Sequence, residues 1–112
     1  MEIRCENEGS VTVAVLVGRL DGNTAAIVQT EILPKIHATE PRVILDLSLL
    51  DYISSAGLRS LLDLAKKIRT KAGKLVVADM KDQIREIFEI SGFQSVIPAY
   101  PDVTLARQAL AR

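Results

Sequence analysis

Residues 42–69 read RVILDLSLLDYISSAGLRSLLDLAKKIR and carry the clearest structural signal in the chain. After Arg42 they contain a short continuous apolar run that ends in an acid, Asp46, a pattern typical of a central strand covered on both faces. After a loop, two serines, an alanine and a glycine lead into a helix, whose apolar residues share one face: Leu58, Leu61, Leu62, Ala65 and Ile68. The stretch therefore predicts a strand, a loop and an amphipathic helix.

The N-terminal segment predicts a pair of strands. Residues 11–17 carry valine at every second position, which places β-branched side chains on one side of a strand. Residues 3–6 are its expected partner, joined to it through the turn-like segment at residues 8–10. Residues 18–23 are expected to break the second strand.

A first helix is expected after these strands. Asn23 or Asp21 carries a side-chain oxygen that can cap its first turn. Pro34 predicts a kink or an early end, because proline has no N–H group and clashes with the preceding turn.

The C-terminal part continues the alternation of strands and helices. Gly73 stands where a C-cap glycine belongs, and residues 74–79 predict a strand. Asp82 is expected to cap a third helix, residues 95–97 to form a short edge strand, and Asp102 to cap a last helix.

The expected order is β-β-α-β-α-β-α-(β)-α. Strands that alternate with helices predict an α/β fold, here with a mixed sheet of four to five strands and about four α-helices. The length of 112 residues suits a single domain, residues 1–112. In such sheets, functional sites collect at the ends of strands where helices begin.

Composition excludes several function classes. Fourteen basic residues balance fourteen acidic ones, so the charge favours neither nucleic acid nor an anionic membrane. The single cysteine, Cys5, cannot form an internal disulfide and is expected to be a small buried hydrophobe. The sequence contains no cluster of cysteines and histidines that could bind a metal, and we expect no cofactor. The N-terminus is no signal peptide and the apolar runs are too short to span a bilayer, so we expect a cytoplasmic protein without membrane insertion.

Ser54 and Ser55 lie at the start of the strongest predicted helix. One of them is expected to be its N-cap, which is the ordinary task of a serine in that position. A phosphate on an exposed serine there would add about −1.5 to −2 charges. The helix start tolerates that charge, because free N–H groups and the positive end of the helix dipole meet there.

Residues 46–59, DLSLLDYISSAGLR, resemble the motif of STAS-domain anti-sigma factor antagonists. The family motif is an apolar strand that ends in Asp-Leu-Ser, then an aromatic and an apolar residue, then Asp-Ser-(Ser/Thr/Ala)-Gly-Leu. Residues 18–21, Gly-Arg-Leu-Asp, with Thr24 and Ala25 resemble the Gly-Glu-Leu-Asp loop before the first helix of the family. The order of strands and helices fits the STAS fold along nearly the whole chain.

The resemblance implies a binding switch and no enzyme. Members of the family bind an anti-sigma factor that is also an ATP-dependent serine kinase, and this binding frees the sigma factor. The kinase phosphorylates the serine before the (Ser/Thr/Ala)-Gly pair, the phosphoprotein dissociates, and a phosphatase, often of the PP2C type, resets it. On this chain that serine is Ser55, which is followed by Ala56 and Gly57.

The chain departs from the family at Ser54, where the family commonly has aspartate. Ser54 is therefore a second, less favoured candidate for phosphorylation. Gly57 could let a partner backbone approach closely, and Arg59 is either a solvated surface residue or a partner for an acid on the bound protein. The expected partner contacts are Asp21, Thr24, Ser54, Ala56, Gly57 and Arg59.

Three other features invite different interpretations. Asp21 and Asp46 stand at predicted strand ends, as in enzymes that hold metals or phosphoryl groups, but further acids are missing; we expect Asp21 to cap a helix or contact the partner and Asp46 to bind loop amides. His37 is expected near the end of the first helix, as a cation there. Five basic residues form a cluster that either is solvated or meets an acidic partner or a phosphate: Lys66, Lys67, Arg69, Lys71 and Lys74.

A second function remains open within the same family. STAS domains also occur as subunits of ABC transporters for phospholipid trafficking and as regulatory parts of anion transporters. A subunit of this type would form a lasting complex with an ATPase and would need no phosphoserine. The serine at position 55 favours the anti-sigma factor antagonist.

Overall fold

The computed structural model describes residues 1–111. Within them the chain forms six strands: β1 (Glu2–Glu8), β2 (Val11–Leu20), β3 (Arg42–Asp46), β4 (Leu50–Ile53), β5 (Lys74–Ala78) and β6 (Ala99–Tyr100). Four α-helices accompany them: α1 (Ala25–Ile32), α2 (Ser55–Arg69), α3 (Asp82–Ile90) and α4 (Val103–Leu110). Two 3₁₀ turns complete the structure, η1 (Leu33–Lys35) and η2 (Phe93–Ser95).

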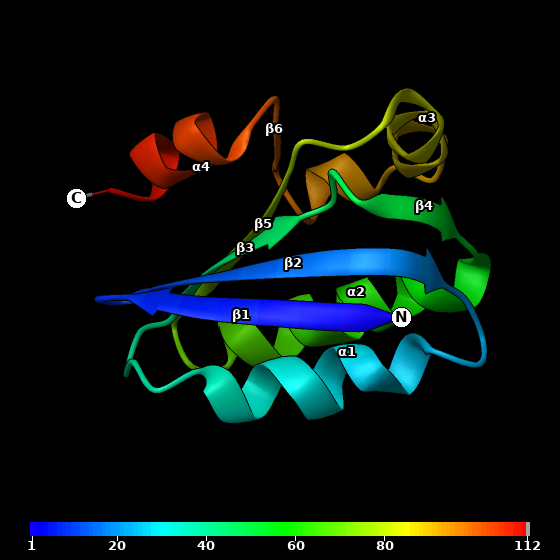
Figure 1. Ribbon diagram of the computed structural model, residues 1–112. Helices are drawn as coiled ribbons and strands as arrows, with labels where there is room; N and C mark the ends of the chain where they lie inside the picture. Colours follow the sequence, from blue (N-terminus) through cyan, green and yellow to red (C-terminus); the bar gives the residue numbers. More distant parts are fainter. Residues whose placement is uncertain (112) are drawn as a thin grey trace.

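The strands form one mixed sheet in the order β1-β2-β3-β5-β6 (Figure 1). β1 pairs with β2 in antiparallel fashion, and the other pairs are parallel. The long strand β2 has two successive neighbours on the same side, because its first half pairs with β3 and its last three residues pair with β4. The register shifts between Gly18 and Arg19, and Gly18 adopts a φ of +108° there, which favours glycine.

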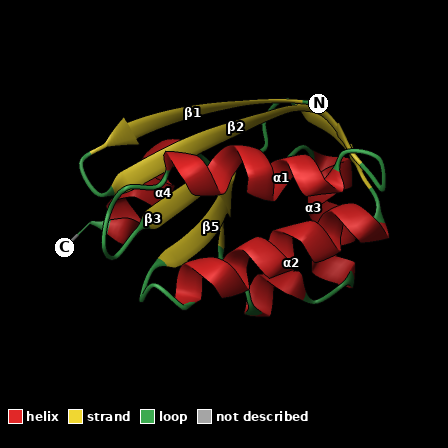
Figure 2. Cartoon of the chain, turned by 90° about the horizontal axis from the view of Figure 1, so that it is seen from below, coloured by secondary structure: helices red, strands yellow, loops and turns green. Residues whose placement is uncertain are grey.

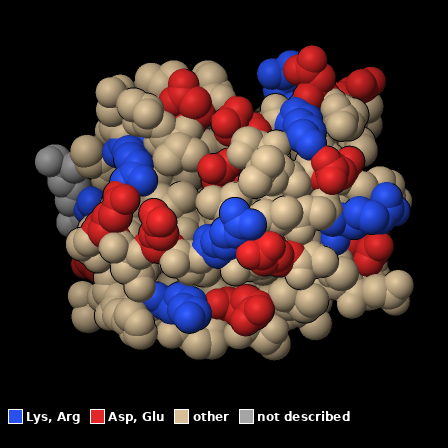
Figure 3. Space-filling view, viewed as in Figure 1, with Lys and Arg blue, Asp and Glu red and all other residues tan. Residues whose placement is uncertain are grey.

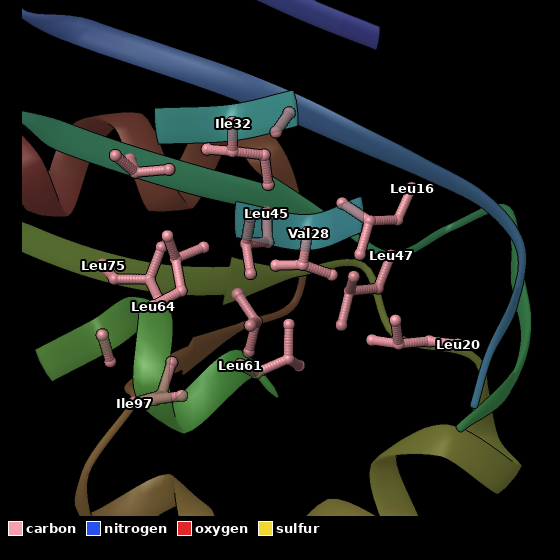
Figure 4. Packing of buried hydrophobic residues seen from close by; sticks show 14 of the residues in the cluster. Leu16, Leu20, Val28, Ile32, Leu45, Leu47, Leu61, Leu64, Leu75 and Ile97 are labelled. Atoms are coloured by element: carbon pink, nitrogen blue, oxygen red, sulfur yellow. The ribbon is translucent and has the colours of Figure 1, made fainter. Parts of the chain in front are cut away.

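The helices cover the sheet unequally. α1 and α2 lie side by side on one face, as Figure 2 shows, and enclose the larger core with α3 at its end. This core is aliphatic and closely packed around Leu16, Leu45, Leu61 and Leu64 (Figure 4). The opposite face carries α4 alone and a smaller core that includes Ile44, Val76 and Ala106. The predicted α/β fold with a mixed sheet is confirmed, with one strand more than the expected upper limit.

The strand predicted over residues 11–17 is longer than expected. Gly18 does not break β2, which continues to Leu20 and pairs with β4. β4 was itself not expected, because its four residues lie in a segment that we interpreted as loop. Residues 95–97 form no strand; Ser95 belongs to η2, and the edge strand β6 follows Pro98.

Two helix caps also differ from the expectation. The N-cap of α1 is Thr24, rather than Asp21 or Asn23, and that of α3 is Lys81, so that Asp82 is the first helical residue. Asp102 caps α4 as predicted, because its Oδ1 accepts the Leu105 N–H at 2.8 Å. The early end of α1 is confirmed, since the α-helix stops at Ile32.

The buried positions on α2 differ from the prediction at two residues. Leu64 is fully buried in the larger core, although it was not among the predicted core residues, and Leu62 is only half-buried. The helix begins with Ser55, so both positions follow from its register.

Candidate functional site

The site is built where α2 begins, directly after β4. The Ser54 N–H donates to the Leu20 carbonyl at 2.9 Å, which fixes the helix start to the end of β2. Ser54 is the N-cap, because its Oγ accepts the Gly57 N–H at 3.2 Å. Ser55 is the first helical residue and is exposed, whereas Ser54 is half-buried. The two serines therefore have different surroundings, and only Ser55 presents a hydroxyl that is not the cap.

Gly57 is required by the fold itself. A Cβ at this position would lie 2.5 Å from the Leu20 carbonyl oxygen and 3.0 Å from Cγ1 of Ile53. Because Gly57 has no side chain, the start of α2 can lie close to the end of β2 in the same molecule. Gly57 is buried, so the close approach that we expected a partner backbone to make is made by Leu20.

The loop after β2 lies next to this helix start, because Leu20 pairs with Ile53. Its shape is fixed locally: the Asp21 N–H donates to Thr24 Oγ1 at 2.9 Å, and Thr24 Oγ1 donates to the Arg19 carbonyl at 2.9 Å. Asp21 Oδ1 accepts the Asn23 N–H at 3.0 Å. The Asp21 carboxylate therefore orders the turn before α1, although it is not the cap of that helix.

Helices α1 and α2 are joined beside the site. Ser60 Oγ donates to the Ala25 carbonyl at 2.6 Å, a contact that holds the first turn of α1 against α2. An open depression of about 240 Å³ lies above this contact, with Ala26, Ala56 and Arg59 among its lining residues. The small side chains of Ala26 and Ala56 leave room for this depression between the two helices.

The electrostatic setting of Ser55 is favourable for an anion. No acidic residue lies in the first turn of α2, where the positive end of the helix dipole lies. The N–H groups of Ser55 and Ala56 belong to the first turn, where an α-helix leaves its donors without intrahelical acceptors. Arg59 is exposed one turn further along the same helix.

Sequence reasoning missed two residues at this end of the sheet. The Arg19 guanidinium lies 4.1 Å from the centre of the Tyr52 ring, and its Nε lies 3.9 Å from Asp21 Oδ2. Arg19 thereby connects β4 to the loop that precedes α1. The pairing of Arg19 with Tyr52 follows from the β2–β4 ladder, so no signal in the sequence could have placed the two side chains together.

The expected site residues thus fall into groups. Asp21 and Thr24 lie in the loop after β2, beside Ser54 and Ser55, as the paired strand ends require. Ala56 and Arg59 line the depression between α1 and α2. Gly57 faces the interior.

The residues that suggested other chemistry have structural tasks. Asp46 Oδ1 accepts the Ser48 N–H at 3.0 Å, which confirms its predicted role in binding loop amides. His37 follows η1 and lies five residues beyond the last residue of α1. Cys5 is half-buried and packs against the larger core, and burial raises the pKa of its thiol. In residues 1–111, no three His, Cys, Asp or Glu side chains are grouped as a metal would require.

None of the helices in the described part of the chain is both long enough and apolar enough to pass through a membrane. The face drawn in Figure 3 carries positive and negative side chains in alternation, without a field of one sign. This distribution agrees with the balanced composition.

Comparisons with known proteins identify the family of the chain. The family model described as the STAS domain matches residues 2–106. A Bordetella bronchiseptica protein assigned as the anti-sigma factor antagonist BtrV is 40% identical over 111 residues, which are 99% of this chain and 92% of that protein. The anti-sigma F factor antagonist of Paenibacillus polymyxa is 27% identical and covers 89% of this chain and 86% of its own length.

Solved structures share the fold. An anti-sigma factor antagonist (STAS) domain protein from Planctomyces limnophilus superposes with a TM-score of 0.86 at 23% identity and covers 98% of both chains. The Bacillus cell fate determinant SpoIIAA in its phosphorylated form superposes with a TM-score of 0.66 at 18% identity, over 98% of this chain and 100% of that one. The chain belongs to the STAS-domain family of anti-sigma factor antagonists.

Proposed function

We propose that this protein binds an anti-sigma factor through the start of α2 and is released when Ser55 is phosphorylated. The observation that supports this most strongly is the separation of tasks between the two serines. Ser54 Oγ holds the N-cap, while Ser55 is exposed in the first helical position. Phosphorylation of Ser55 would therefore leave the cap in place and change only the surface that the partner meets.

The proposed partner-binding surface has three parts. The exposed start of α2 supplies Ser55 and Ala56, the ordered loop after β2 supplies Asp21 and Thr24, and the rim of the depression supplies Arg59. A phosphate on Ser55 would place about −1.5 to −2 charges among these groups. Any partner carboxylate paired with Arg59 would then face a like charge, which weakens binding.

The proposal extends to the proteins that set the switch. The anti-sigma factor is a serine kinase that phosphorylates Ser55 in the complex, and a PP2C-type phosphatase removes the phosphate. The chain acts in the cytoplasm as a binding module and not as an enzyme. Ser54 is the poorer acceptor, because its hydroxyl is half-buried and already accepts the Gly57 N–H.

A capture experiment from the native cytosol tests this function. The wild-type chain is compared with Ser55→Glu and with Ser10→Glu, which adds the same charge at the other end of β2. The ten residues of β2 span about 30 Å, so the two positions lie at opposite ends of the strand. We expect the wild type and Ser10→Glu to capture a small serine-kinase ATPase, and Ser55→Glu to capture little of it.

Two other outcomes would count against the proposal. Equal capture of the kinase by all three baits would show that charge at Ser55 does not control binding. Equal capture of ABC transporter subunits, in place of a kinase, would favour the alternative transporter role and reduce Ser55 to a surface residue.

A further inference from the structure

A groove runs along the open side of β5, between the end of α2 and the end of α4. Its volume is about 280 Å³. We name it the β5-edge groove and define it by Arg69 of α2, Lys74 and Leu75 of β5, Pro98 and Tyr100 around β6, and Leu110 of α4. It lies at the opposite end of α2 from Ser55, and the 15 residues of that helix span about 22 Å.

The groove contains an incomplete strand edge. β6 has only two residues and pairs with Val77 and Ala78, so the first half of β5 has no strand beside it on that side. The Val77 N–H donates to the Pro98 carbonyl at 3.0 Å on the β6 side, whereas the Lys74 N–H donates to the Pro41 carbonyl at 2.9 Å on the opposite side.

The side to which each backbone group points follows from this pattern. Successive residues of a strand direct their N–H and C=O groups to alternate sides. Leu75 therefore points to the same side as Val77, where the groove lies and where no residue of the described chain continues β6. A main-chain donor and acceptor thus face the groove, and such groups are a template for another strand.

The charge of the groove is uniform. Arg69 and Lys74 are the charged residues that line it, and neither takes part in the ion pairs found within residues 1–111. The other members of the basic cluster lie outside the groove, and Lys67 donates to Gln29 on α1. The cluster recognised in the sequence is therefore divided, and only two of its five residues share a binding surface.

We propose that the β5-edge groove binds an extended acidic segment of a partner protein, which adds to the sheet beside Leu75. The main chain of that segment pairs with the Leu75 N–H and C=O, as in other cases of strand addition. Its carboxylates pair with Arg69 and Lys74, while its alternate side chains lie against the apolar walls from α2 and α4. The open backbone favours a peptide over a simple anion, because an anion would use only the two cations.

The free protein offers the first test, by amide hydrogen exchange measured residue by residue with NMR. The Leu75 amide should exchange at least tenfold faster than those of Val76 and Val77, although all three lie in the same strand. Equal protection of Leu75 and Val77 would show that the edge is closed and would overturn the proposal.

The second test is a titration with a capped seven-residue peptide in which valine and glutamate alternate. We expect saturable shifts of the amides around Leu75 and Tyr100, and slower exchange of the Leu75 amide. Two control peptides should fail, one with lysine in place of glutamate and one with N-methylated main-chain nitrogens. Equal shifts with all three peptides, or shifts centred elsewhere, would contradict strand addition.

Charge reversal provides the matched variants. Arg69→Glu with Lys74→Glu should weaken the glutamate peptide about tenfold and allow the lysine peptide to bind, as expected for two exposed charge pairs. Lys66→Glu with Lys71→Glu makes the same change of net charge outside the groove and should leave both peptides unaffected. Equal effects of the two double variants would show attraction by overall charge only. The outcome does not depend on phosphorylation of Ser55.

Discussion

At the scale of single residues, two adjacent serines divide the work of the site. Ser54 satisfies a backbone donor of the first turn, and Ser55 is left exposed on the surface. The sequence predicted a serine cap at this helix but could not choose between the two positions. The choice depends on the hydrogen bond from the Ser54 N–H to Leu20, a contact between segments that are far apart in the chain.

Replacement of each serine should separate these tasks. Ser54→Ala removes the side-chain acceptor for the Gly57 N–H and should lower the free energy of unfolding by about 1 kcal/mol. Ser55→Ala removes an exposed hydroxyl and should change it by less than about 0.5 kcal/mol. Urea unfolding followed by circular dichroism measures both. A loss as large for Ser55→Ala as for Ser54→Ala would show that Ser55 is structural.

A second residue-scale prediction concerns Gly57. An alanine Cβ there would meet the Leu20 carbonyl oxygen at 2.5 Å, so Gly57→Ala should cost about 1–3 kcal/mol through overpacking. Ala56→Gly serves as a comparison at the neighbouring exposed position. Thermal unfolding should show a clearly lower midpoint for Gly57→Ala. An unchanged midpoint would mean that α2 can move away from β2 without cost.

At the scale of elements, the two ends of α2 differ in how well the sequence described them. The amphipathic pattern predicted the helix correctly, and its start is confirmed near Ser54. Gly73 was expected to be the C-cap glycine, but the residue with positive φ is Ala72, at +57°. Gly73 is needed for another reason, because a Cβ there would lie 2.3 Å from the Pro41 carbonyl oxygen. Spacing alone cannot distinguish a glycine selected for φ from one selected for close packing.

This C-terminal end gives a pair of opposite predictions. Ala72→Gly relieves a left-handed alanine and should stabilise the protein by up to about 1 kcal/mol. Gly73→Ala should destabilise it by about 1–3 kcal/mol, because the new methyl group meets the main chain of Pro41. Chemical denaturation of both variants measures whether the free energy of unfolding rises or falls in each. Stabilisation by Gly73→Ala would contradict this account of the helix end.

At the scale of the whole molecule, the sequence predicted the sheet, its covering helices and the pairing of the first two strands, but not the order of the other strands. β4 was not predicted because it is short and because it pairs with the end of β2, beyond the part that pairs with β3. The hydrophobic periodicity of the sequence also could not predict how the helices are distributed over the two faces of the sheet. α1 and α2 share one face with the larger core, and α4 alone covers the other.

The unequal cores predict unequal costs of truncation. Leu64→Ala in the larger core should lower the free energy of unfolding by about 2–5 kcal/mol, since Leu64 is fully buried among side chains from several elements. Leu110→Ala, at the end of α4 and in the smaller core, should lower the free energy of unfolding by about 2 kcal/mol or less. Guanidinium unfolding measures both. A larger loss for Leu110→Ala would show that α4 contributes more to stability than its core suggests.

The proposed switch depends on the site, the helix and the sheet together, and one binding measurement tests it. Isothermal titration calorimetry compares the affinity of the purified anti-sigma factor for the unmodified chain, for the chain with phosphoserine at position 55, and for a control with phosphoserine at position 10. We predict that phosphoserine at 55 weakens binding at least about tenfold, a change of about 1.4 kcal/mol, and that phosphoserine at 10 leaves it unchanged. Equal affinity of all three forms would contradict the proposed switch.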